Sequence, residues 1–273
     1  VAAREKRRGP SVVTTDEIAN SVRVRSSQVA NHAIPCAEPI DPPEAELPIP
    51  PYSLGVWLGD GTTLDGSLTL GNRDSAAILA GLDADDTAWK LRPGASRNRP
   101  SAQSIGLPGF GATLKANALF GAKHIPSAYL RGSYKQRLAL LQGIMDTDGY
   151  VVASGSGSGR GFGAASCEIT QVKERLAMDV LALVRSLGIK ASVSEGRATI
   201  GGRDCGPKWR ITFQTDLPVA RVAFKANRLT PLRTQRCRYR YIVACDPIEP
   251  VPMRCIGVDS PDHTFLVTES MIA

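Results

Sequence analysis

Two aspartates stand in matching frames of this sequence, and their placement suits the binding of a divalent metal. Asp60 stands near the end of Ser-Leu-Gly-Val-Trp-Leu-Gly-Asp-Gly, and Asp148 stands near the end of Leu-Gln-Gly-Ile-Met-Asp-Thr-Asp-Gly. We expect each segment to be the last turns of a helix, where the helix dipole disfavours negative charge. We therefore expect Mg²⁺ or Mn²⁺ between the two carboxylates, with the carbonyls of Gly59 and Thr147 as further ligands.

The two segments must pack closely if the aspartates are to meet. Gly55 and Gly59 are four residues apart and lie on one helix face, and so do Gly143 and Thr147. Small residues at this spacing let two helix backbones approach each other. Two such helices, paired side by side, would bring their aspartates together at one end.

The glycine after each aspartate predicts how the two helices end. Gly61 and Gly149 are expected to adopt the left-handed conformation that commonly follows a helix. A near copy of the motif, Leu-Ala-Gly-Leu-Asp-Ala-Asp-Asp at 79–86, lacks this closing glycine. We interpret it as an ordinary helix end and turn.

Both motifs are followed by the same pattern of elements, which predicts a duplicated half-domain. A strand and then a helix are expected after the first motif, at 67–70 and 74–82, and after the second, at 167–172 and 173–187. Gly188 should end the last of these helices. Further strands are expected at 191–195, 197–200 and 209–213, with turns at 201–202 and 206–207.

The motif pair resembles that of the two-motif, intein-encoded LAGLIDADG homing endonucleases. The second motif matches the family pattern at Gly143, Asp146, Asp148 and Gly149, and the first resembles the intein variant Leu-Gly-x-Trp-Leu-Gly-Asp-Gly. The resemblance implies an α+β class with a pseudo-two-fold duplicated αββαββα fold, and metal binding by the final acid of each motif. The first motif has Leu58 where the second has Asp146, so we interpret Asp146 as structural.

The family also carries one basic residue beside the metals in each half. Lys123-His124-Ile125-Pro126 resembles the Lys-x-Ile-Pro segment that precedes the second motif of intein endonucleases. For the second half we choose Lys225 as catalytic, with Lys208 as its rival. Such a lysine could polarise the attacking water or neutralise charge on the phosphate. The alternative for either lysine is an ordinary surface residue.

The charge balance favours a polyanionic partner. The 273 residues include 33 basic and 26 acidic ones, with a net charge of +7, which suits double-stranded DNA. The resemblance implies that strands enter the major groove, so candidate DNA contacts lie at alternate strand positions. They are Arg73, Arg160, Thr170, Arg197, Lys208 and Arg210, with Thr69, Glu168 and Thr212 as further candidates. The alternative is a solvated basic face.

The ends of the sequence resemble parts of an intein. Residues 255–267 resemble a C-terminal splicing block, of which His263 would be a remnant. No Cys or Ser stands first and no terminal His-Asn follows, so we expect no splicing by this chain alone. The order of segments is most similar to inteins of bacterial replicative DNA helicases.

Three parts are therefore expected. Residues 1–50 should hold a helix beginning near Thr14 and a proline-rich linker, and 51–240 should form the endonuclease domain, with halves at about 51–130 and 131–240. Residues 241–273 should be a residual, β-rich splicing segment.

The function expected from these features is that of a site-specific homing endonuclease. It would hydrolyse both strands of a long DNA site in an intein-free allele, and so initiate intein homing. Both motifs lie on one chain, which favours a monomer. No secretory signal or apolar run of 18 residues is evident and no CxxC pair occurs among the six cysteines, so we expect a bacterial cytoplasmic protein without membrane segment or zinc site. The alternatives are a catalytically decayed DNA-binding module and a protein-splicing fragment.

Overall fold

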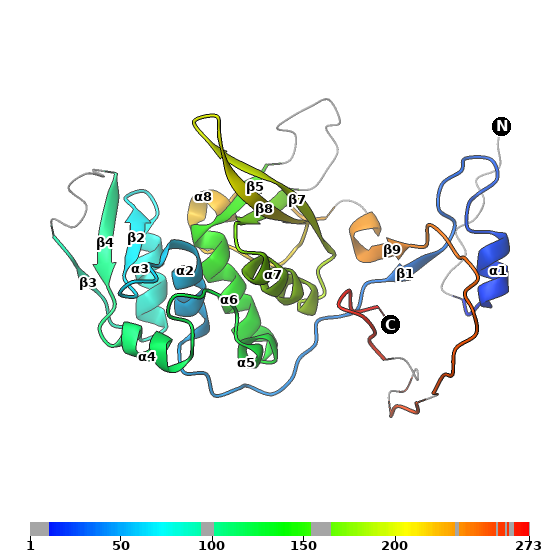
Figure 1. Ribbon diagram of the computed structural model, residues 1–273, viewed down its shortest axis with the longest axis horizontal. Helices are drawn as coiled ribbons and strands as arrows, with labels where there is room; N and C mark the ends of the chain where they lie inside the picture. The colour runs from blue at the N-terminus through cyan, green and yellow to red at the C-terminus, as the bar shows by residue number, and fades with distance from the viewer. Residues whose placement is uncertain are drawn as a thin grey trace.

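A pair of helices forms the centre of the computed structural model, which describes residues 11–93, 101–153, 165–232, 235–254, 256–259, 261 and 265–272. These helices, α2 (Pro51–Asp60) and α6 (Tyr134–Thr147), lie side by side between two antiparallel sheets (Figure 1). Helices and antiparallel sheets therefore alternate in one body, and the predicted α+β class is confirmed.

The first half has a three-stranded sheet in the order β2-β4-β3. After α2, the elements of this half are, in chain order, β2 (Leu68–Gly71), α3 (Ser75–Ala84), β3 (Lys90–Leu91), β4 (Ala102–Gly106) and α4 (Phe110–Ala116). The expected αββαββα order includes a strand between α2 and β2. In the described chain this strand is reduced to one isolated bridge, between Gly61 and Leu68. The near copy of the motif at 79–86 ends α3 and enters a turn, as predicted.

The second half repeats this order with longer strands. After the connecting helix α5 (Ser127–Leu130) and α6 come β5 (Gly149–Val152), β6 (Ser166–Gln171), α7 (Glu174–Ser186), β7 (Ala191–Ile200), β8 (Arg203–Phe213) and α8 (Ala223–Ala226). The sheet order is β5-β6-β8-β7. Because β6-β8-β7 corresponds to β2-β4-β3, the two halves share one strand order, and the predicted duplication is confirmed.

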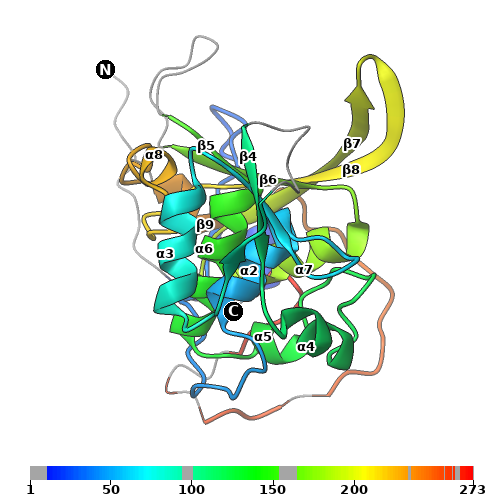
Figure 2. The same ribbon diagram turned by 90° about the vertical axis from the view of Figure 1, so that its left-hand side faces the viewer.

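The β7–β8 hairpin differs from the three strands that the sequence predicted. The turn at Gly201 and Gly202 is present, with φ of 55° and 80°. The predicted turn at Gly206 and Pro207 is wrong, because both residues lie inside β8. A register shift between Arg197 and Thr199 lets the strands stay paired past these residues, and the hairpin curves away from the body (Figure 2).

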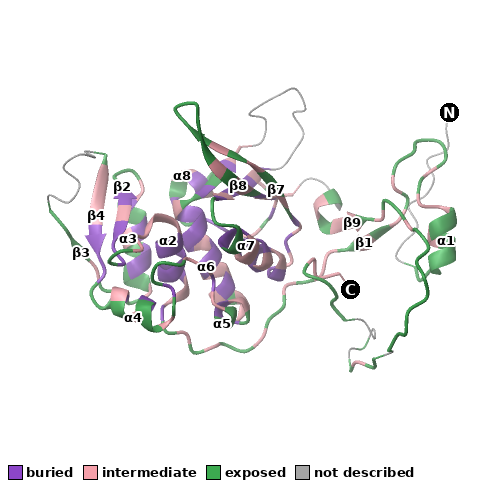
Figure 3. Cartoon of the chain, in the orientation of Figure 1, coloured by how far each residue is buried: buried purple, intermediate pink, exposed green. Residues whose placement is uncertain are grey.

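The buried residues lie along the central helices and the elements that cover them (Figure 3). Helix α2 is buried from Tyr52 to Leu58, because α6 and α3 both pack against it. Helix α7 is apolar on one face only, where Leu176, Val180 and Leu183 meet the second sheet. It ends before Gly188, which has a φ of 74°, as predicted.

The N-terminal segment begins with a capped helix and lies apart from the two halves in Figure 1. Helix α1 (Thr15–Asn20) starts at Thr14, whose side chain forms a capping box with Glu17. Strand β1 (Ala33–Pro35) pairs with β9 (Tyr239–Tyr241), which follows the short helix η1 (Gln235–Arg238). This pairing joins the predicted N-terminal part, 1–50, to the end of the predicted endonuclease domain, because two of the three residues of β9 lie before residue 241.

The proline-rich linker after β1 contains no helix or strand, but it is fastened to the second half. Gln136 at the start of α6 exchanges hydrogen bonds of 3.0 and 2.7 Å with the backbone of Ala45. The buried guanidinium of Arg137 donates to the carbonyl of Ile40. The linker is therefore extended, as predicted, and it packs along the domain that follows it.

The described residues after β9 are mostly irregular, with one isolated bridge between Val267 and Ile272. Among the described residues of 241–273, the expected β structure is limited to Tyr241, the last residue of β9, and this bridge. His263 lies outside the described residues. No helix in the described part of the chain has the length and apolarity needed to cross a membrane.

Candidate metal and DNA site

The close approach of α2 and α6 depends on the two glycines that face each other. A Cβ atom at Gly55 would lie 2.3 Å from the carbonyl oxygen of Leu140, and one at Gly143 would lie 2.3 Å from that of Tyr52. Further along, a Cβ at Gly59 would lie 2.0 Å from the hydroxyl of Thr147. The two helices therefore run parallel and their C-terminal ends meet, as the i, i+4 spacing predicted.

The glycines after the two aspartates have a different role from the one predicted. Gly61 has a φ of −79°, and Gly149 begins β5 without a positive φ, so the left-handed assignment is wrong. A Cβ at Gly61 would lie 2.1 Å from the indole of Trp57, and one at Gly149 would lie 2.6 Å from the Cα of Met145. Glycine is required because the chain leaves each helix by passing close against its last turn.

Asp60 and Asp148 lie at the adjoining ends of the two helices. Asp60 is the last residue of α2, and Asp148 is the C-cap residue of α6. Burial and then the nearby charge of Asp148 raise the pKa of Asp60 to about 6, against the opposing effect of Lys225 and Lys123. Gln171, at the end of β6, donates a hydrogen bond of 2.8 Å to Asp148.

The two lysines chosen from the sequence cap these helix ends. Lys123 Nζ donates to the carbonyls of Leu58 and Gly59, at 2.9 and 3.0 Å, and lies 5.2 Å from the centroid of the Trp57 ring. Lys225 is only 5% exposed, and its Nζ donates to three carbonyls of α6 at 2.8–3.1 Å. Neither lysine is therefore an ordinary surface residue. Lys208, the rival candidate to Lys225, lies on β8.

The lysines change the electrostatic balance expected from the sequence. That expectation assigned the charge compensation at the helix ends to a metal, but two ammonium groups supply part of it. Burial lowers the pKa of Lys123 and of Lys225, and the nearby carboxylates oppose this effect. The carbonyls of Gly59 and Thr147 accept from these lysines, and each oxygen retains a second lone pair.

The oxygen groups at the helix ends fit a hard divalent cation. Within the described ranges, no cluster of three or more His, Cys, Asp or Glu side chains suits a metal. Magnesium does not need such a cluster, because it binds through one or two carboxylates with waters and phosphate oxygens completing its shell. Asp60, Asp148 and the adjacent carbonyls would supply that donor set.

Asp146, which the sequence analysis interprets as structural, is buried and its carboxylate accepts hydrogen bonds within the protein. It is 1% exposed, and it accepts hydrogen bonds from the Tyr52 hydroxyl at 2.9 Å and from the backbone N–H groups of Arg221 and Val222 at 2.8 and 3.0 Å. Burial raises the pKa of Asp146, and these hydrogen bonds oppose the shift. Its oxygens are thus engaged within the protein.

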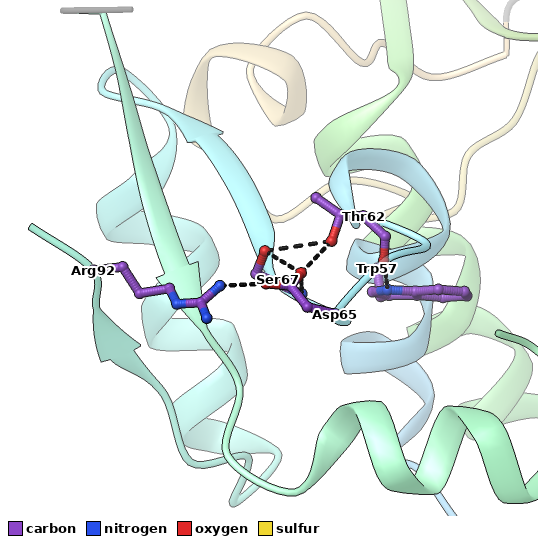
Figure 4. A network of polar contacts seen from close by, with 5 residues as sticks. All are labelled: Trp57, Thr62, Asp65, Ser67 and Arg92. Carbon is purple, nitrogen blue, oxygen red and sulfur yellow. Dashed lines mark hydrogen bonds and ion pairs between the residues drawn. The ribbon is translucent and has the colours of Figure 1, made fainter. Parts of the chain in front are cut away.

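A polar network fixes the loop that follows Asp60 (Figure 4). Asp65 accepts from Thr62, from Arg92, and from the backbone and hydroxyl of Ser67 at 3.0 and 2.7 Å. These hydrogen bonds hold the pKa of Asp65 well below its usual range. The Trp57 indole donates to the Thr62 carbonyl at 3.1 Å and ties the loop to α2. Sequence reasoning missed this network, because Arg92 reaches Asp65 only through the folding of the first sheet.

Three of the predicted DNA-contacting residues share one face of the second sheet. The register places Thr170 opposite Arg210, and Lys208 two residues before Arg210 on the same strand face. The opposite face carries the buried residues Ile169 and Ile211. The outer face is therefore polar and accessible, and Arg210 forms an ion pair of 2.9 Å there with Glu168.

Of the other residues predicted to contact DNA, Arg197 and Arg73 lie elsewhere. Arg197 alternates to the other face of β7, opposite Pro207, and forms an ion pair with Asp204. Arg73 precedes α3 and stacks 3.8 Å above the Phe224 ring, so it bridges the two halves. Arg160 lies outside the described residues. Of the further candidates, Glu168 and Thr212 lie opposite each other on the same outer face as Thr170 and Arg210, and Thr69 lies on β2.

The raised pKa of Asp60 predicts how stability changes with pH in the presence of a chelator. A carboxyl whose pKa rises on folding, here from 3.8 to about 6, binds more protons in the folded state, so stability falls as pH rises through this window. Asp60→Asn removes the buried charge and should stabilise the protein at pH 7.5 by roughly 1–2 kcal/mol. Denaturant unfolding with EDTA at pH 7.5 and pH 4 tests this.

The stabilisation by Asp60→Asn should disappear at pH 4, where the wild-type carboxyl is mostly protonated in the folded state. Glu44→Gln, which neutralises an exposed acid of the linker, is the matched control and should change little at either pH. An Asp60→Asn variant that is equally stable or less stable than wild type at pH 7.5 would contradict the electrostatic argument.

Comparisons with known proteins agree with the motif pair. Residues 135–214, which span α6 to β8, match the model of the LAGLIDADG-like domain. The chain is 31% identical, over 98% of its length, to the replicative DNA helicase DnaB of Mycobacterium intracellulare, and it spans 42% of that protein.

A solved structure from work on mesophilic variants of the homing endonuclease I-DmoI aligns over 61% of this chain and 83% of its own, with a TM-score of 0.38 and 10% identity. The match at 135–214 includes the second motif, and the first motif repeats it in the preceding half. Residues 135–214 therefore match a LAGLIDADG-like domain, and the preceding half repeats the motif of that domain at Asp60.

Proposed function

We propose that this protein is a metal-dependent, site-specific endonuclease that cuts both strands of DNA. The observation that carries the proposal is the junction of α2 and α6, where two acids, the buried Lys225 and the half-buried Lys123 meet at adjoining helix ends. A structural role alone does not account for two carboxylates at the ends of helices that already carry partial negative charge. Metal-dependent hydrolysis of a phosphodiester uses carboxylates that lie together in this way, because they can hold the metal ion.

The residues at this junction would have distinct roles. Asp60 and Asp148 would hold the metal, and the carbonyls of Gly59 and Thr147 could complete its protein ligands. When bound, Mg²⁺ or Mn²⁺ supplies Lewis acidity and lowers the pKa of bound water. Lys123 and Lys225 would neutralise charge that develops on the phosphate, and their burial strengthens that attraction. Gln171 would hold Asp148 in place through its 2.8 Å hydrogen bond.

The outer face of the second sheet is the surface that we assign to DNA. Thr170, Lys208 and Arg210 share this face, and the net charge of +7 favours contact with phosphates. The Arg210–Glu168 ion pair is partly exposed, so Arg210 can exchange this partner for a base edge or phosphate at little cost. Both halves are present in one chain, which favours action as a monomer.

The similarity to a DnaB helicase supports an intein origin. The chain spans less than half of that protein, and we propose that 51–240 is the endonuclease domain while 1–50 and 241–273 derive from splicing segments. The target would then be a bacterial helicase gene that lacks the insertion, and the protein would act in the bacterial cytoplasm. His263 would be a remnant of the splicing site.

A decayed nuclease that still binds DNA is the second candidate, because the first half departs from the second. Leu58 replaces the buried acid of the second motif, and the strand before β2 is reduced to one bridge. A protein of this kind would retain the basic sheet surface but would not cut.

We expect the protein to linearise a plasmid that carries an uninterrupted bacterial replicative helicase gene. Cutting should require Mg²⁺ or Mn²⁺ and should stop in EDTA, because the carboxylates need a cation to act on phosphate. Gel electrophoresis of the plasmid, followed by sequencing of the ends, measures both the cut and its position. The same gene interrupted by this coding segment is the control and should stay intact.

Failure to cut has two distinguishable causes. A gel shift on the uninterrupted gene without cleavage would indicate the decayed nuclease and would overturn the proposed activity. An absence of both binding and cleavage on a set of such genes would overturn the proposed target.

A further inference from the structure

Each of the two site lysines lies on a short segment whose backbone is held by a carboxylate outside the acid pair at the junction. Asp146 holds the segment of Lys225, and Asp179 holds the segment of Lys123. A long lysine side chain has many rotamers, and ordering it costs conformational entropy. A fixed backbone at its base reduces the number of positions that the ammonium group can reach.

Asp146 forms hydrogen bonds with both the start of the segment that carries Lys225 and the ammonium group of Lys225 itself. Its Oδ1 accepts from the backbone of Arg221 and Val222, and Val222 is the N-cap residue of α8. The N–H of Lys225 donates to the Val222 carbonyl at 2.9 Å, and Lys225 Nζ returns to the Asp146 carbonyl at 2.8 Å. The side chain of Asp146 thus sets where α8 starts, and α8 sets where Lys225 points.

The same carboxylate is also held from the first half. The Tyr52 hydroxyl on α2 donates to Asp146 Oδ2 at 2.9 Å, and the Arg221 guanidinium stacks 4.0 Å above the Tyr52 ring. Arg221 also donates to Gln142 at 2.7 Å. The segment that carries Lys225 is therefore held in position by contacts with both α2 and α6.

A different acid holds the segment that carries Lys123, because the first motif has Leu58 at the position of Asp146. Asp179 on α7, an element of the second half, accepts from the N–H of Ile125 at 2.9 Å. Ile125 is buried and lies two residues after Lys123, whose Nζ reaches α2. The acid missing from the first motif is thus replaced by one from the other half.

We infer that Asp146 and Asp179 are positioning residues, each of which places one site lysine at the end of its motif helix. This inference rests on the proposed function for its catalytic meaning, but the placement itself can be measured without DNA. Asp146 serves Lys225 and Asp179 serves Lys123, so the two acids must have separable effects.

The test measures how fast each lysine reacts with acetic anhydride, by mass spectrometry of peptides. Asp146→Ala should increase the reaction of Lys225 by roughly ten- to a hundredfold, because hydrogen bonds to a charged group are lost, and should leave Lys123 unchanged. Asp179→Ala should give the reverse pattern. Asp146→Asn and Asp179→Asn retain an oxygen acceptor and should restore most of the protection.

The asparagine variants also separate the effect of the hydrogen bond from that of the charge. Asparagine and alanine both remove the negative charge, but only alanine removes the oxygen acceptor. If Asp146→Ala does not fold, Tyr52→Phe serves as a second variant, with a smaller increase at Lys225 alone. Equal exposure of both lysines in either alanine variant, or no exposure of the matched lysine, overturns the inference.

Cleavage supplies an independent readout. With saturating protein, the alanine variants should lower the single-turnover rate of cutting while the affinity for DNA is unchanged. A wild-type protein that binds the DNA without cutting it, but shows the selective labelling, overturns the proposed function and supports the positioning roles.

Discussion

Asp148→Asn is expected to abolish DNA cleavage while DNA binding is retained. The substitution keeps the shape of the side chain and removes the negative charge that would bind the cation. Loss of an outer-sphere partner of a metal typically costs 10–100-fold, so loss of a ligand should lower the cleavage rate by more than about a hundredfold. Asp60→Asn should have a similar effect, because each aspartate ends one of the paired helices.

Single-turnover cleavage and gel shifts on the same DNA check this prediction. Asp83→Asn is the matched control, since Asp83 is an exposed acid of α3 whose oxygen accepts from Trp89 at 2.8 Å. It should cut at the wild-type rate. Normal cutting by either junction variant would sink the metal-ligand assignment, and loss of DNA binding would show that the aspartates do more than hold a cation.

Gly143→Ala is expected to destabilise the fold more than any surface substitution. The added Cβ would lie 2.3 Å from the Tyr52 carbonyl and 2.7 Å from the Val56 nitrogen. These are backbone atoms of α2, so a rotamer change cannot relieve the contact and the helices must separate. Overpacking typically costs 1–3 kcal/mol, occasionally more, and we expect about 2–4 kcal/mol here.

The expected fall in Tm for Gly143→Ala is roughly 5–15 °C for a domain of this size, as measured by circular dichroism or calorimetry. Gly71→Ala is the matched control, because no atom lies within 4 Å of the Cβ that it would add. Unchanged stability of Gly143→Ala would contradict the close packing of α2 and α6. A stable variant that fails to cut would instead show that the helix separation matters for the site alone.

The two predictions are linked through geometry. The spacing between the helices, set by Gly55 and Gly143, also sets the spacing between Asp60 and Asp148. A small separation of the helices would therefore weaken a shared metal site before the fold is lost.

The sequence determined the features that depend on short-range pattern. The paired motifs predicted two helices with small facing residues, because Gly55 and Gly143 lie at helical spacing from Gly59 and Thr147. Residue periodicity located β2, α3, β6 and α7 to within about two residues, and Thr14 and Gly188 marked a helix start and a helix end. Each of these signals lies within a few residues of the structure that it specifies.

Tertiary structure decided two features that the sequence pattern did not specify, which are the backbone after each motif and the extent of β8. Gly61 and Gly149 are needed for close passage past Trp57 and Met145, and local sequence does not distinguish this from a left-handed turn. Gly206 and Pro207 stay in β8 because β7 pairs alongside.

The contacts of the candidate site show the same division. The sequence supplied the two aspartates and two lysines, but the hydrogen bonds of Gln171 to Asp148 and of Ile125 to Asp179 join residues 23 and 54 positions apart. Folding of the second half brings Gln171 to Asp148, and packing of the two halves brings Ile125 to Asp179. The chemical groups of the site are thus written in local motifs, and their placement is set by long-range pairing and by the meeting of α2 and α6.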